Sequence, residues 1–222
     1  MLGRALFSSV ILSGTVFGGV LAQIADTLDI GAVTKLTRQT GNPELAAAYL
    51  SQEGRRHTAA ELDALADSLV MIATTYERAG SAESDRAARA AVNALVLAAN
   101  GPYLANRSRK LEKLGHPQVL APYPRAFDAL VRIFDEAADS GLRHGTLYGI
   151  TQLPDSARVV AFLGSVARSA TSYAVTAVRH LSMDLGAAGI TELRGLFLAD
   201  AVVEPTAKQN LIAFANVRGW RR

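Results

Sequence analysis

Two pairs of acidic residues are the first groups in this sequence whose type and spacing could support chemistry. Asp63 and Asp67 lie four residues apart, and so do Asp135 and Asp139. On a helix, each pair places two carboxylates on one face, where they could bind a cation or act as general acid and base. The Glu-x-x-His repeat of helical two-metal sites occurs nowhere in the sequence. Isolated acidic pairs are usually solvated surface residues, so these pairs alone do not predict an enzyme.

Histidine and cysteine usage argues against a metal centre. Glu53 and His57 are four residues apart, as are Glu112 and His116, but each pair spans a glycine at which its helix is expected to end. The chain contains no cysteine, so disulfides, thiolate metal ligands and cysteine nucleophiles are excluded. We predict no bound metal and no cofactor.

Catalytic and nucleotide-binding motifs are also missing. Glu83-Ser84 invites comparison with helical peptidoglycan-cleaving enzymes, but their Gly-Leu-Met-Gln type companion is absent, and GLRH at 141–144 is a poor substitute. Three glycines between positions 141 and 149 follow no predicted strand, so they are not a dinucleotide-binding fingerprint. No Walker or G-x-S-x-G sequence is present. We predict that the protein is not an enzyme.

The chain begins with a long uncharged segment, residues 5–25, which reads ALFSSVILSGTVFGGVLAQIA. As an α-helix this run would be about 31 Å long, close to the thickness of a bilayer core. Arg4 precedes the run, and Asp26 and Asp29 follow it. Three interpretations compete: a membrane anchor, a secretory signal cleaved between Ala22 and Gln23, and a helix buried inside an assembly.

Small residues in the run favour the third interpretation. Gly14, Gly18, Ala22 and Ala25 recur at helical spacing, and the first two form a GxxxG step that lets another helix approach closely. Leaving so much apolar surface in water costs about 25 cal/mol per Å². We predict an uncleaved helix that docks through this stripe on another helix, of this chain or of a second copy. Lipid contact through residues 5–25 is the alternative.

The net charge of +3 conceals two blocks of opposite sign. Residues 26–85 carry ten acidic and five basic side chains, whereas residues 86–125 carry seven basic side chains and one acid. A basic block of this kind fits the acidic surface of a neighbouring subunit. Nucleic-acid binding would need denser charge with interleaved aromatic residues, so we do not expect it. The predicted basic interface consists of Arg107, Arg109, Lys110 and Lys113.

Composition and periodicity predict an all-α fold. Half of the residues are hydrophobic and only 6% are aromatic, which favours closely packed helices over a β-sandwich. Residues 58–61 form a capping box and Ser81 caps the next helix, so residues 59–100 are expected to form a helical hairpin. We expect an Ala-rich bundle of about seven helices with an apolar N-terminal helix. Its predicted core includes Leu65, Leu69, Leu95, Phe134, Leu163 and Val166.

Prolines and glycines suggest how the chain is divided. The expected regions are an apolar helix with its extension (1–38), a helical hairpin region (42–115), a Pro-rich hinge (116–124) and a C-terminal helical region (125–222). In the last region we predict a helix over 125–140, a glycine-punctuated loop over 141–149 and a long helix over 154–185. An interruption at 186–189 then precedes two final helices, one on each side of Glu204-Pro205, and Leu211, Phe214 and Val217 lead to Trp220 near the C-terminus.

These features favour a structural or interaction subunit of a large ordered assembly, such as a virion shell or a multi-subunit membrane-associated complex. The helical shell proteins of membrane-containing phages are similar in kind, because they too are small, Ala-rich and apolar at the start. The expected partners are further copies of this chain and other subunits. The alternative is an exported helical binding module, periplasmic or secreted, whose N-terminal segment is a signal peptide or anchor.

Overall fold

The computed structural model describes residues 28–51, 57–76, 80–100 and 121–221 of the 222-residue chain. Within these ranges the chain is mostly helical and contains no strand, which confirms the all-α prediction. The same ranges contain ten helices, so the expected number of about seven is too small. In chain order the helices are α2 (Ile30–Thr40), α3 (Glu44–Leu50), α4 (Ala59–Thr74), α5 (Ala82–Ala99), α8 (Ala126–Glu136), α9 (Ser140–Thr151), α10 (Ser156–Ala167), α11 (Tyr173–Met183), α12 (Gly186–Leu198) and α13 (Pro205–Val217).

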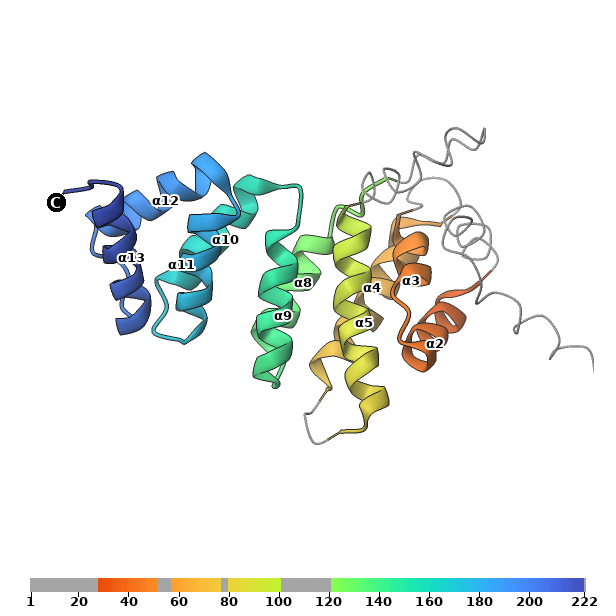
Figure 1. The fold of residues 1–222 in the computed structure, drawn as a ribbon. Helices are drawn as coiled ribbons and strands as arrows, with labels where there is room; N and C mark the ends of the chain where they lie inside the picture. The colour runs from red at the N-terminus through yellow and green to blue at the C-terminus, as the bar shows by residue number, and fades with distance from the viewer. Residues whose placement is uncertain (1–27, 52–56, 77–79, 101–120, 222) are drawn as a thin grey trace, which may run out of the picture.

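The helices lie side by side in an elongated row, with α2 at one end and α13 at the other (Figure 1). Helix α4 packs against α5, α8 against α9 and α10 against α11, while α12 and α13 both pack on α11. Helix α9 joins the two halves of the row, because it contacts α5 in one half and α10 and α11 in the other. Buried apolar side chains form one continuous cluster through both halves.

Helix α5 is the centre of the first half, where α2, α3, α4, α8 and α9 all pack against it. Its buried residues are mostly alanines, and the larger ones among them are Val92 and Leu95. Small side chains let neighbouring helix axes approach closely, and alanine also has the highest helix propensity. The alanine-rich sequence of α5 therefore suits a helix that several neighbours share.

Local capping signals in the sequence are confirmed. The Thr58 hydroxyl accepts a hydrogen bond from the Glu61 N–H at 3.3 Å, and the Glu61 carboxylate accepts one from the Thr58 N–H at 2.7 Å. Ser81 accepts a hydrogen bond from the Ser84 N–H at the start of α5. These bonds satisfy N–H groups that the first helical turn leaves without partners, so they fix where α4 and α5 begin.

The periodic apolar positions are also confirmed as core. The six predicted core residues come from four helices and are all buried: Leu65, Leu69, Leu95, Phe134, Leu163 and Val166. Aromatic side chains add edge contacts around this core, since Phe134 packs edge-on against Phe162 and Tyr173 with ring centroids 5.5 and 5.2 Å away.

The helix expected over 125–140 ends earlier, because α8 stops at Glu136. Ala137 is extended, and Asp139 begins α9 by accepting a hydrogen bond from the Leu142 N–H at 2.7 Å. The glycine-punctuated stretch 141–149 therefore lies within α9, and the prediction of a loop there is wrong. The Asp139 N-cap fixes where α9 begins, and burial of Leu142, Leu147 and Ile150 stabilises the helix against the weakening effect of its glycines.

The long helix expected over 154–185 is two helices, α10 and α11. Between them, the Ser169 hydroxyl donates to the Val166 carbonyl at 2.7 Å and lies 2.8 Å from the Thr171 hydroxyl. Serine and threonine side chains that bond nearby backbone compete with helical hydrogen bonds, which explains the break. Near the C-terminus, Leu211 is buried, whereas Val217 is 86% exposed.

Two glycines lie at close contacts between helices rather than at breaks. A Cβ atom on Gly149 of α9 would lie 2.8 Å from Cγ2 of Val96 on α5. A Cβ atom on Gly189 of α12 would lie 2.2 Å from the carbonyl oxygen of Leu181 on α11. Residues 186–189, where we expected an interruption, therefore belong to α12, whose backbone approaches α11 because Gly189 has no side chain.

Only the end of the expected Pro-rich hinge, residues 121–124, lies within the described ranges. The Ala121 N–H donates to the Ser51 carbonyl and the Tyr123 N–H to the Ala98 carbonyl, both at 3.0 Å. Helix α2 begins at Ile30 behind its own N-cap, Asp29, so residues 30–38 belong to a helix with a separate start. The proposed division of the chain into four regions stays a prediction.

Replacing Leu69 with alanine tests the packing of α4. Leu69 is fully buried, and its truncation should lower the free energy of unfolding by roughly 2–5 kcal/mol, because it leaves a cavity in the core. Met71 lies two residues away on the same helix and is 53% exposed, so Met71→Ala should change stability by less than about 1 kcal/mol. Urea unfolding of the two variants measures the difference, and equal midpoints would contradict this packing.

Candidate interaction surface

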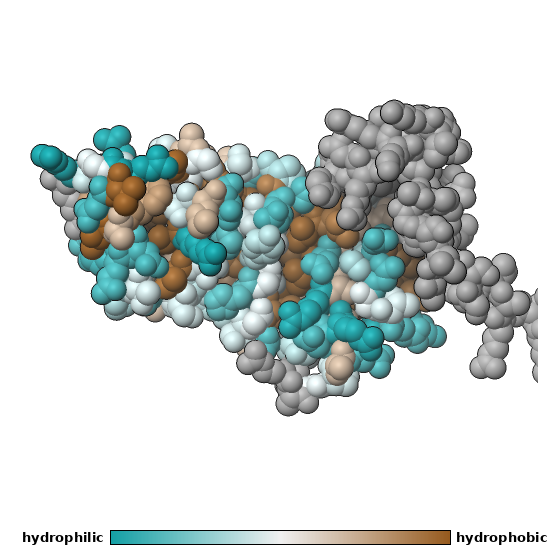
Figure 2. All heavy atoms as spheres, in the orientation of Figure 1, coloured by the Kyte–Doolittle hydropathy of each residue, from teal (hydrophilic) through white to brown (hydrophobic). Residues whose placement is uncertain are grey.

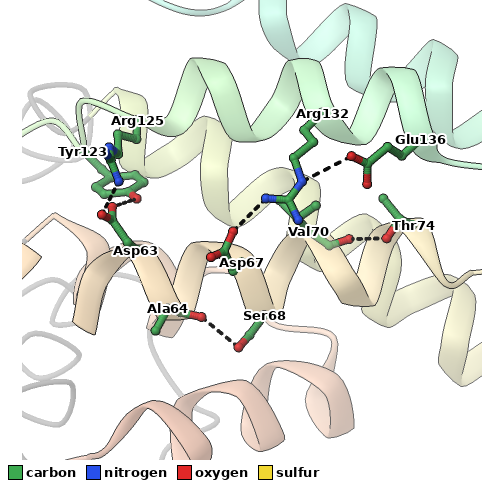
Figure 3. Close-up of polar contacts among 10 residues, drawn as sticks. All are labelled: Asp63, Ala64, Asp67, Ser68, Val70, Thr74, Tyr123, Arg125, Arg132 and Glu136. Carbon is green, nitrogen blue, oxygen red and sulfur yellow. Dashed lines mark hydrogen bonds and ion pairs between the residues drawn. The ribbon is translucent and has the colours of Figure 1, made fainter. Parts of the chain in front are cut away.

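The first acidic pair lies where α4 faces α8 (Figure 3). The Asp63 carboxylate accepts a hydrogen bond from the Tyr123 hydroxyl at 2.7 Å, and its other oxygen forms an ion pair with Arg125. Tyr123 is only 4% exposed, and the segment that it belongs to connects directly to α8. Asp63 therefore satisfies a buried hydroxyl and holds the start of α8 against α4.

Asp67 makes the second contact of this pair, one turn further along α4. Nη1 of Arg132 lies 2.8 Å from the Asp67 carboxylate, and Nε of the same arginine lies 3.4 Å from Glu136 (Figure 3). All three side chains are at least half exposed, so this group contributes little to stability. Both aspartates are thus occupied by arginine or tyrosine, and they do not form a free carboxylate pair for a cation.

The environment of Tyr123 also fixes its charge state. Burial, together with the hydrogen bond that the hydroxyl donates to Asp63, raises the pKa of Tyr123 well above its usual value. Burial also raises the pKa of Tyr49 in α3 and of Tyr76 after α4. Each of these side chains stays neutral at physiological pH, which suits a packing role rather than proton transfer.

The second acidic pair serves the helix start at α9. Asp139 is buried and caps α9, while the carbonyl of Asp135 accepts a hydrogen bond from Arg143 at 2.9 Å. Glu83, the residue that invited comparison with helical peptidoglycan-cleaving enzymes, is exposed in the first turn of α5. A negative charge at that position stabilises the helix dipole. The carboxylates of Asp139 and Glu83 therefore serve helix starts, whereas Asp135 contributes only its backbone carbonyl to the Arg143 contact.

The described histidines pack against aromatic rings. His57 stacks on Tyr49 with ring centroids 3.8 Å apart, and its expected partner Glu53 lies outside the described residues. Nδ1 of His180 lies 2.5 Å from the carboxylate of Asp184, which comes one helical turn later in the sequence. Within the described residues, no serine, threonine or tyrosine hydroxyl forms a hydrogen bond with His180. The described ranges contain no group of three or more potential ligands that could hold a metal ion.

The clearest candidate for an interaction surface is the exposed face of α13. Five residues at helical spacing form what we call the α13 outer face: Gln209, Ile212, Ala213, Asn216 and Val217. Every exposed residue of α13 is uncharged, and its only charged residue, Lys208, is half-buried and paired with Asp200 at 3.0 Å. On α5, by contrast, the exposed residues include Glu83, Arg86 and Arg89.

Apolar exposure is concentrated at the same end of the row. Of the seven large apolar side chains that are exposed in the described part of the chain, five lie between α11 and the end of α13: Met183, Leu198, Val203, Ile212 and Val217. Figure 2 shows hydrophobic residues on the visible face over α12 and α13. Exposed apolar groups gathered in this way are typical of surfaces that bind another protein.

Basic residues border the α13 outer face. The guanidinium of Arg218 lies over the ring of Phe214, 5.3 Å from its centroid, and Trp220 packs against Phe214 and Phe197. Neither Arg218 nor Arg221 forms an ion pair with a carboxylate of the described residues. An uncharged face bordered by two cations fits an apolar partner that carries acidic residues at one end.

The site residues predicted from sequence lie outside the described residues. This applies to the helix-packing stripe, Gly14, Gly18, Ala22 and Ala25, and to the basic interface, Arg107, Arg109, Lys110 and Lys113. Both sets stay predictions. We did not predict the α13 outer face from the sequence. Its signal in the sequence is the stretch 209–217, nine residues of a surface helix without a charge.

A search of the described helices finds none with both the length and the apolar character that crossing a membrane requires. Comparison of the chain with protein-family models, with curated proteins and with solved structures finds no match.

Two aspartates one turn apart provide a matched test of the α4–α8 contact. Asp63→Ala leaves the buried Tyr123 hydroxyl without its partner, so it should cost roughly 1–3 kcal/mol. Asp67→Ala breaks only an exposed ion pair and should cost less than about 1 kcal/mol. Both changes make the same gain in helix propensity, so urea unfolding isolates the buried contact. An equal loss in both variants would contradict the role given to Asp63.

The raised pKa of Tyr123 predicts a loss of stability in alkali. A phenol that holds its proton more tightly in the folded state contributes fully below its unfolded pKa of about 10, and this contribution falls as the pH rises above that value. Tyr123→Phe removes the ionisable group. The stability difference between wild type and Tyr123→Phe, measured by urea unfolding, should therefore shrink or reverse between pH 8 and about pH 11. A constant difference over that range would show that Tyr123 ionises equally in both states.

Proposed function

We propose that this protein is a non-enzymatic structural subunit of a large ordered assembly and that it associates with further copies of itself. The observations that carry this proposal are the uncharged exposed face of α13 and the five exposed large apolar side chains between α11 and the end of α13, at one end of an elongated row of helices. A free monomer would be expected to carry a polar surface on its terminal helix, as the end repeats of stacked helical proteins do.

Two further features support association rather than catalysis. The acidic residues with catalytic spacing, Asp63, Asp67 and Asp139, are engaged in ion pairs, a buried hydrogen bond and a helix cap. Their side chains serve to hold helices together. The sequence also contributes the uncharged run at 5–25, which we propose is an apolar helix that needs cover from protein or lipid.

These surfaces support one class of assembly. A helical subunit with the proposed apolar helix over residues 5–25 and an uncharged face on α13 suits a virion shell or a membrane-associated complex of many subunits. The basic interface at Arg107, Arg109, Lys110 and Lys113 would then contact acidic surfaces of neighbouring subunits, and this contact should weaken as salt is added.

Placing charge on the α13 outer face tests this proposal. The double variant Ile212→Glu, Val217→Glu should shift the full chain from large species to monomers in sedimentation velocity, because apposed surfaces would have to bury two carboxylates. Met71→Glu changes an apolar residue on α4 whose exposure, 53%, lies between those of Ile212 and Val217, and it should assemble as the wild type does.

Circular dichroism of the double variant should match the wild type, since both positions are exposed and the fold does not depend on them. A wild-type chain that stays monomeric from micromolar to millimolar concentration would overturn the proposal. A mature protein that begins at Gln23 and binds a small ligand as a monomer would favour the exported binding module instead.

A further inference from the structure

We propose that the α13 outer face receives the uncharged run, residues 5–25, of a second copy of this chain. This inference rests on the proposed function and names the partner surface for it. The two segments share one property: the run has no charge over 21 residues, and the exposed residues of α13 have none either. Each would bury apolar area without desolvating an ion.

The position of the two segments makes the contact one between copies. Residues 5–25 precede α2, and α2 lies at the opposite end of the row from α13 (Figure 1). A run that enters at the α2 end of one copy and docks on the α13 end of another gives a head-to-tail contact. Such a heterologous contact leaves one free end on each side, so it propagates into rings or filaments.

The shapes of the two surfaces also fit. As a helix, the run would place the small residues Gly14, Gly18 and Ala22 on one face, and these would leave a shallow groove there. On α13, a helix of 13 residues, the exposed branched side chains of Ile212 and Val217 lie at opposite edges of the outer face, because five residues turn the helix to positions about 140° apart. Branched side chains on one helix that meet small residues on the other permit a short distance between the axes.

Flanking charges fix the direction of docking. Asp26 and Asp29 follow the run, and Arg218 and Arg221 follow α13. A parallel arrangement brings the aspartates of one copy to the arginines of the other, whereas an antiparallel arrangement brings Arg4 to the same arginines. Neither arginine forms an ion pair with a described carboxylate of its own copy, and the parallel arrangement would give both of them acidic partners.

A complementation experiment tests this contact. One full-length variant carries Gly14→Leu and Gly18→Leu, which block the run, and the other carries Ile212→Glu and Val217→Glu, which block the α13 outer face. Each variant alone should be monomeric in sedimentation velocity. Their mixture retains one intact run and one intact face, so it should form a 1:1 dimer and nothing larger. The matched control, Val10→Leu with Val16→Leu, alters the run away from the glycine stripe and should assemble as the wild type does.

The outcomes distinguish the two proposals. If the variant with Ile212→Glu and Val217→Glu is monomeric but the variant with Gly14→Leu and Gly18→Leu assembles normally, the α13 outer face is an interface and residues 5–25 do not occupy it. That result overturns this inference and leaves the proposed function standing. If the mixture stays monomeric, or if the assembled wild type begins at Gln23, the inference is also overturned. If the wild type never assembles, both proposals fail. Flotation of a monomeric wild type with phosphatidylcholine vesicles would identify lipid as the cover for the run.

Cysteine pairs test the direction. The chain has no cysteine of its own, so a copy with Ala22→Cys can be mixed with a copy with Asn216→Cys. Parallel docking should give a disulfide between these two copies under mild oxidation, whereas Ser8→Cys with Asn216→Cys should not cross-link. Cross-linking of the Ser8 pair in place of the Ala22 pair would overturn the parallel arrangement. A single chain can also carry both Ala22→Cys and Asn216→Cys. If a disulfide forms only within this chain at low concentration, and never between the mixed single-cysteine copies, the contact between copies is overturned.

Discussion

Close contact between helices through small side chains is the constraint on which the rest of this structure depends. Helix α5 receives five neighbours, and most of its buried residues are alanines. Where α9 crosses it, even a Cβ atom on Gly149 would collide with Val96. Since α9 also connects the two halves of the row, the spacing between α5 and α9 sets where α10–α13 lie relative to α2–α8. The position of α13 at the far end follows from this contact.

Polar residues secure the arrangement that the small residues allow. Asp63 holds the segment before α8 through a buried tyrosine, and Asp139 starts α9 where an uninterrupted helix would otherwise continue from α8. Residues that resemble catalytic groups in the sequence are thus used for register and capping. The surface that is left for function is the one where such polar contacts are scarce, namely the exposed side of α13.

The sequence predicts the local features of this fold well because they depend on neighbouring residues. The capping box at Thr58, the cap at Ser81 and the apolar stripe through Leu65 and Leu69 all appear as expected. Glycine was harder to interpret, because Gly149 and Gly189 look like helix breaks in sequence and are explained only by a helix that crosses them.

The same limit applies to the candidate surface. Ile212 and Val217 follow a helical pattern, and nothing local says which side of the last helix the rest of the molecule covers. Only the position of α13 against α11 and α12 leaves these residues exposed. The predicted stripe at Gly14 and Gly18 depends on a partner rather than on the described helices, so it stays a prediction.

Hydrogen exchange of the full-length chain as a function of concentration tests the central claim, that another copy covers the α13 outer face. Assembly should slow exchange of the amides in residues 205–217 as the concentration rises from micromolar to millimolar, because a covered terminal helix opens less often. The amides of α5, already buried among five helices, should exchange at the same rate throughout. Exchange in α13 that is independent of concentration, in a sample that sediments as a large species, would contradict the account.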